Sequence, residues 1–79
     1  MIDIETQTPL RISTDGDAGP YLMVPLNQLA EVRRVLERNG IKHVVEDDAI
    51  QWDDKPVIVV IDFDYRADVP KIQEALDAA

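Results

Sequence analysis

The sequence contains no cysteine and few of the residues that build catalytic sites. Without cysteine there is no disulfide, thiolate metal ligand or thiol nucleophile, which favours a reducing compartment. The three glycines, Gly16, Gly19 and Gly40, form no phosphate-binding loop. No serine or threonine stands in a nucleophile elbow, and the single histidine, His43, is typical of a surface position. We therefore expect a protein that is not an enzyme.

Long apolar runs are also absent. A membrane-spanning helix needs about 18 apolar residues or more, and no segment of the chain approaches this length. Residues 1–5 have neither the basic start nor the apolar stretch of a secretory signal. The sequence therefore predicts a cytoplasmic protein that does not engage a membrane.

Positive charge is scarce, with 8 Lys and Arg against 16 Asp and Glu, and the net charge is −8. Because nucleic acid is bound by basic patches, we expect no nucleic-acid partner. Residues 46–68 contain eight acidic and two basic residues, whereas residues 25–43 contain four basic and two acidic ones. The acidic segment either complements the basic one within the fold, binds a cation, or meets a basic protein.

The acidic residues do not have the spacing of a known metal loop. Asp15 with Asp17, and Asp62 with Asp64, are the best pairs, but neither has the further acids and the terminal glutamate of an EF-hand. In a strand, Asp62 and Asp64 point to one side, where they share an ion with Asp68 or mark the point at which the strand meets water. We expect neither a metal nor a cofactor.

Hydrophobic residues make up 46% of the 79 residues, which is typical of a globular protein with room for one core. Residues 1–8 are polar and lack periodicity, so we expect a flexible N-terminal arm followed by a single α/β domain over residues 9–79. At 100° per residue, the apolar side chains of residues 25–39 share one face of a helix. Pro25 suits its first position and Gly40 the position after its end. Asp68 suits the N-cap of a second helix.

Five segments have the composition of β-strands. Residues 57–61 are five consecutive branched apolar residues, typical of a strand that is covered on both faces. The others are residues 9–14, 21–24, 41–46 and 49–52. Together with two helices they predict an α+β fold, a ferredoxin-like two-layer sandwich with a mixed sheet of four or five strands and both helices on one face.

In this layout, residues 21–24 and 57–61 are the adjacent inner strands and residues 41–46 form an outer strand. The usual last strand after the second helix is missing. Residues 9–14 either take that edge, as in a hairpin with residues 21–24, or are carried elsewhere by the long loop between them.

The second face of this sheet has no helix to cover it. Alternate residues of the central strand point to opposite sides, and both sets are apolar, whereas an open sheet usually presents polar residues to water. The N-terminal segment, a second copy of the chain or a different protein would provide the cover. The expected contact residues are Tyr21, Met23, Trp52, Ile58 and Val60.

The leading hypothesis is a small non-enzymatic protein-interaction or regulatory module that acts through this apolar face, with a second copy of itself or with another protein. The first alternative is an acidic inhibitor or immunity-type protein whose residues 46–68 occupy a basic site on a partner. The second is a sensor of a small anionic ligand held by Arg33, Arg34 and Lys42, although acidic neighbours on the helix also offer the two arginines ion pairs.

Overall fold

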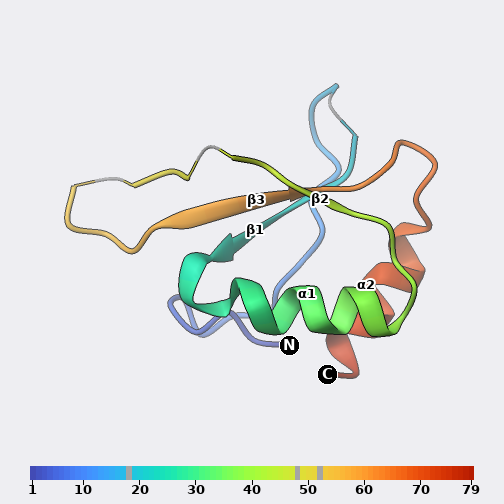
Figure 1. The fold of residues 1–79 in the computed structure, drawn as a ribbon, viewed down its shortest axis with the longest axis horizontal. Helices are drawn as coiled ribbons and strands as arrows, with labels where there is room; N and C mark the ends of the chain where they lie inside the picture. The colour runs from blue at the N-terminus through green and yellow to red at the C-terminus, as the bar shows by residue number, and fades with distance from the viewer. Residues whose placement is uncertain (18, 48, 52) are drawn as a thin grey trace.

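The computed structural model describes residues 1–17, 19–47, 49–51 and 53–79. Its elements are β1 (Tyr21–Pro25), the 3-10 turn η1 (Leu26–Gln28), α1 (Leu29–Arg38), β2 (Val44–Val45), β3 (Ile58–Asp62) and α2 (Val69–Asp77). Figure 1 shows the strands along one side of the molecule and both helices below them. The fold is therefore α+β with a sheet layer and a helix layer.

The sheet has the order β1-β3-β2, and both pairings are antiparallel. Because β1 and β2 both run opposite to β3, they are parallel to each other and are connected through α1, as in a split β-α-β unit. The central position of β3 and the outer position of β2 are as expected. Among the described residues, the sheet has three antiparallel strands instead of the expected four or five mixed ones, and isolated bridges from Ser13 to Tyr21 and from Ile50 to Ile58 extend it.

Residues 9–14 approach the edge of β1 but pair with it at one point. Tyr21 and Ser13 exchange backbone hydrogen bonds of 2.9 and 2.8 Å. Before this point the segment is held by α2 instead, since the side chain of Gln73 donates to the carbonyl of Leu10 and accepts from the amide of Ile12, both at 2.9 Å. Attachment to the helix layer therefore shortens the predicted strand.

The first helix begins later than predicted and ends where predicted. Pro25 is the last residue of β1, with an extended backbone, and Leu26, which the periodicity placed on the buried face, is 49% exposed in η1. At the other end Gly40 has a φ of +66°, and the amide of Ile41 donates to the carbonyl of Leu36 at 2.9 Å. This is a Schellman motif, which explains the glycine.

The second helix begins as the sequence predicts. The Asp68 carboxylate accepts a hydrogen bond of 3.1 Å from the Lys71 amide, and Pro70 occupies the first turn, where its missing N–H has no cost. Both helices bury their apolar stripes against the same side of the sheet. The main cluster is made by Leu10, Leu22, Val24, Val32, Val35, Leu36, Ile41, Ile61, Phe63, Ile72 and Leu76.

Residues 1–8 lie against the helix layer. The buried side chain of Gln28 donates to the carbonyl of Ile2 at 2.6 Å and accepts from the amide of Ile4 at 3.1 Å. The Met1 ammonium group donates to the carbonyl of Leu76. The flexibility expected for this arm stays a prediction about motion, but its contacts are with η1, with α2 and with Pro9 and Leu10, which follow it in the chain. It therefore does not supply the cover of the second face of the sheet.

Candidate interaction surface

The side of the sheet opposite the helices, here called the outer face, is formed by alternate residues of the strands. Cross-strand partners point to the same side of a sheet, so the pairing register identifies them. Across the sheet, Asp62 lies between Tyr21 and Val44, Val60 lies opposite Met23, and Ile58 lies between Pro25 and Ile50. The outer face consists of Tyr21, Met23, Pro25, Val44, Ile50, Ile58, Val60 and Asp62.

The outer face is apolar and only partly covered. Met23 is 46% and Val44 63% exposed, and Ile58 and Val60 are half-buried, whereas Pro25 at the end of β1 is fully buried. In contrast, Leu22, which follows Tyr21 and points to the helices, is 1% exposed. The structure thus brings Tyr21, Met23, Ile58 and Val60 together on one face, as the alternation predicted. Trp52, the fifth residue of that prediction, lies outside the described residues.

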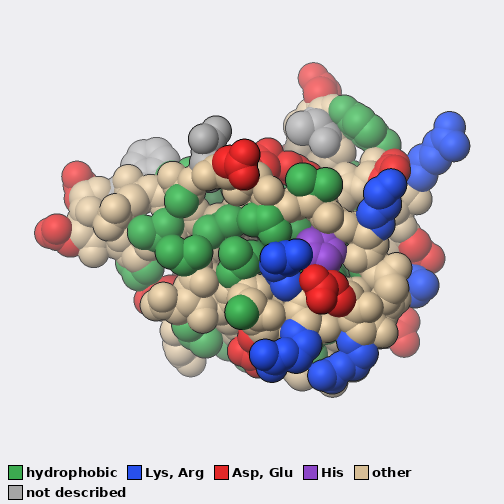
Figure 2. All heavy atoms as spheres, viewed as in Figure 1, with side chains coloured by type: hydrophobic (Ala, Val, Ile, Leu, Met, Phe, Trp, Pro, Cys, Tyr) green, Lys and Arg blue, Asp and Glu red, His purple; other side chains and the backbone are tan. Residues whose placement is uncertain are grey.

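Val44 was missed by the sequence interpretation, although it is the most exposed aliphatic residue of the face. The sequence indicated only that Val44 belongs to a strand over residues 41–46. In the structure this strand is Val44–Val45, and its pairing with β3, which places Val44 opposite Asp62, could not be predicted from nearby residues. In the view of Figure 2, hydrophobic side chains form a continuous area over the strands. Acidic side chains lie along its upper border, while basic ones gather below it and to its right.

Tyr21 connects the outer face to an acidic residue at its edge. Its hydroxyl donates to the Asp15 carboxylate at 2.9 Å. This hydrogen bond is the main reason that the pKa of Tyr21 is raised, and partial burial and the charge of Asp15 act in the same direction. The phenol therefore stays neutral and holds a carboxylate beside the apolar area.

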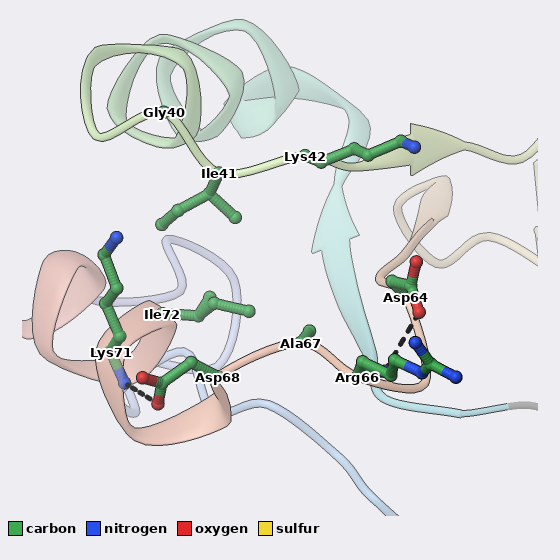
Figure 3. A pocket seen from close by; sticks show the side chains of 9 residues that line it. All are labelled: Gly40, Ile41, Lys42, Asp64, Arg66, Ala67, Asp68, Lys71 and Ile72. Carbon is green, nitrogen blue, oxygen red and sulfur yellow. Dashed lines mark hydrogen bonds between the residues drawn. The ribbon is translucent and has the colours of Figure 1, made fainter.

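A separate hollow of about 270 Å³ lies where the end of α1 meets the start of α2. Figure 3 shows Ile41, Ala67 and Ile72 toward its centre, with Lys42 and Lys71 pointing their amino groups in different directions. Its two carboxylates accept backbone hydrogen bonds, Asp64 from Arg66 and Asp68 from Lys71. Among the described residues, none of the three cations of the hollow, Lys42, Arg66 and Lys71, forms an ion pair.

The predicted anion-binding residues are distributed over two places. Lys42 lines the hollow, but neither Arg33 nor Arg34 does. Arg33 instead forms an exposed ion pair with Glu37 at 3.4 Å, as the i,i+4 spacing predicted. The other cations that line the hollow with Lys42 are Arg66 and Lys71. They come close to Lys42 only because the two helices pack together, so no local sequence pattern predicts them.

His43 lines a smaller hollow with Lys42, Val44 and Asp62. Its Nδ1 lies 2.9 Å from the carbonyl oxygen of Ile41, and its Nε2 is buried without a hydrogen-bond partner among the described residues. The described part of the chain has no group of three or more His, Cys, Asp or Glu residues that could hold a metal ion.

No family model matches the chain, and no curated protein or solved structure is significantly similar to it. Across the described residues, no helix has both the length and the apolar character that crossing a membrane requires.

Proposed function

We propose that the protein is a small interaction module that binds another protein through the outer face. The observation that carries this proposal is the exposure of Met23 and Val44 beside Val60 on strands whose opposite side is already buried under two helices. Contiguous apolar surface of this kind is typical of protein-binding sites. The N-terminal arm, which could have covered it, is bound to the helix layer.

The proposal includes the finer architecture that the sequence predicted. The bridge between Ser13 and Tyr21 lies on the free edge of β1, which is where the last strand of a ferredoxin-like sheet would pair. Residues 9–14 and 49–51 would then be short edge strands on the two sides of the sheet. The cysteine-free composition fits action in the cytoplasm.

A photo-crosslinking amino acid placed at position 23 tests the proposal in cells. Position 4 provides the matched control, because Ile4 and Met23 are both 46% exposed but Ile4 lies in the arm. We expect one defined crosslinked protein from position 23, none from position 4, and loss of the product when Val60→Asp adds a charge to the apolar centre. Circular dichroism checks that the Val60→Asp variant is folded. Equal crosslinking from both positions, or a product that survives Val60→Asp, would contradict the proposal.

A second candidate function is the binding of a small anion in the hollow between the helices. The supporting observation is that its three cations lack ion pairs in the described part of the chain. A ligand that binds only the folded state raises the melting temperature. We expect phosphate or an organic carboxylate to do so for the natural chain and not for Lys71→Gln, whereas the exposed Lys55→Gln control behaves as the natural chain. No stabilisation by any anion would exclude this function.

A further inference from the structure

The charged residues within the strands of the outer face are acidic, and Lys42, two residues before β2, lines a small hollow with Val44 and Asp62. Asp62 occupies an outward position of β3, and Glu46, whose amide donates to the carbonyl of Val60 at 2.9 Å, continues the register of β2 on the same side. The three strands themselves contain no lysine or arginine. The apolar area therefore contains carboxylates, and no residue of its three strands is a lysine or an arginine.

The cations near the border of the outer face each have acidic neighbours. Lys42 lines a small hollow with Asp62 and Asp64, and Lys55 lines another with Asp54. Asp15 adds a further carboxylate beside Tyr21. Basic side chains gather below the apolar area and to its right (Figure 2), so the negative charge lies within the strands and along the upper border.

A second copy of the chain would meet this surface with the same surface. In a twofold symmetric dimer the same patch is used on both sides, so the carboxylates of one copy would face an area that contains carboxylates and no strand-borne cation. Bringing two acidic surfaces together is unfavourable because like charges repel, and each copy already has a net charge of −8. Self-association through this face is therefore disfavoured by its own chemistry.

We infer that the occupant of the outer face is a basic protein surface, in which apolar side chains are flanked by lysine or arginine, and not a second copy of the chain. This inference rests on the proposed function and adds the chemistry of the partner. The apolar groups would pack on Met23, Val44 and Val60, while the cations would form charge-assisted hydrogen bonds with Asp62 and its acidic neighbours. Such a partner would also be steered to the face by charge.

Three short synthetic peptides test the inference on the full chain by nuclear magnetic resonance titration. One alternates lysine with valine, one alternates glutamate with valine, and one alternates lysine with serine. We expect the Lys–Val peptide to shift the amide signals of Met23, Val44 and Val60 and to bind about tenfold more weakly at high than at low salt. The Glu–Val peptide should not bind, and the Lys–Ser peptide should bind much more weakly. Light scattering should show a monomer.

Two isosteric variants provide the matched controls. Asp62→Asn removes a carboxylate from the outer face and should weaken binding of the Lys–Val peptide severalfold. Glu74→Gln removes one from the exposed side of α2 and should leave binding unchanged. If the two variants weaken binding equally, the peptide is attracted by the net charge of the protein and not by the outer face, and the inference is overturned.

The remaining outcomes separate this inference from the proposed function. If the protein forms a dimer that dissociates in Val60→Asp, or if the Glu–Val peptide binds the outer face, the inference of a basic partner is overturned. The proposal that the outer face is an interface would still hold. Binding of the Lys–Ser peptide as tightly as the Lys–Val peptide would exclude an apolar contribution. A monomer whose outer-face signals none of the peptides shifts would count against both the inference and the proposed function.

Discussion

The two faces of the sheet are built from the same strands and from the same kinds of residue, but they meet different surroundings. Ile61 and Val60 are neighbours in β3, and both are branched and apolar. Ile61 is 0% exposed beneath the helices, whereas Val60 remains half-buried on the outer face. Alternation therefore assigns each residue to a side of the sheet, while the other elements of the fold decide what that side contacts.

This difference also separates stability from binding. Complete burial of a large aliphatic side chain contributes about 1.5–3 kcal/mol, and the inner face uses this contribution for folding. On the outer face Met23 and Val44 keep about half of their surface or more in water. The apolar surface left uncovered is available for association with a partner.

Two isoleucines of the same strand give the largest expected effect. Ile61→Ala, on the inner face, should lower the free energy of unfolding by about 4 kcal/mol, because it leaves a cavity in the core. Ile58→Ala, on the outer face, should lower it by about 1–2 kcal/mol, because part of its surface is already in contact with water. Urea denaturation of both variants measures the difference. Equal losses would show that the outer face is as well packed as the inner one.

The sequence was informative wherever local rules decide the structure. Alternation correctly separated the residues of the central strand into two faces, Asp68 caps the second helix, and Gly40 follows the end of the first. These features depend on residues close in the chain. The order of β1, β3 and β2 could also be predicted, because the helical connection between β1 and β2 constrains the choice of topology.

The sequence was less informative wherever contacts between distant segments compete. The strand predicted over residues 9–14 is reduced to two isolated bridges, from Pro9 to Ile2 and from Ser13 to Tyr21, because Gln73, about sixty residues away, takes up backbone groups of Leu10 and Ile12. Arg66 and Lys71 join Lys42 only through the packing of two helix ends. No periodicity or motif records such contacts, so the anion-binding hypothesis named other arginines.

Removal of the Gln73 side chain should have an intermediate effect, since it holds the segment that closes the inner face at the edge of β1. Gln73→Ala leaves the partly buried carbonyl of Leu10 and amide of Ile12 without this partner, and should lower the free energy of unfolding by about 1–3 kcal/mol. Hydrogen exchange at Ile12 should become faster. Glu74→Ala, which removes an exposed neighbouring side chain, should change both by little. If the two variants behave alike, the segment is held by the packing of Leu10 and not by Gln73.

The smallest expected effect is the titration of Tyr21 at the border of the outer face. Its hydroxyl donates to Asp15 only while the phenol is protonated, so the pKa of Tyr21 lies above its ordinary value of 10.0 in the folded protein. The folded state then binds this proton more tightly than the unfolded state does. The resulting contribution to stability is complete below pH 10 and is lost as the pH rises through the folded pKa. Phenolate absorbance in a Tyr65→Phe background, where Tyr21 is the only tyrosine, measures the shift. Asp15→Ala should move the pKa of Tyr21 back toward its ordinary value, and an unchanged pKa would mean that Asp15 does not hold the hydroxyl in solution.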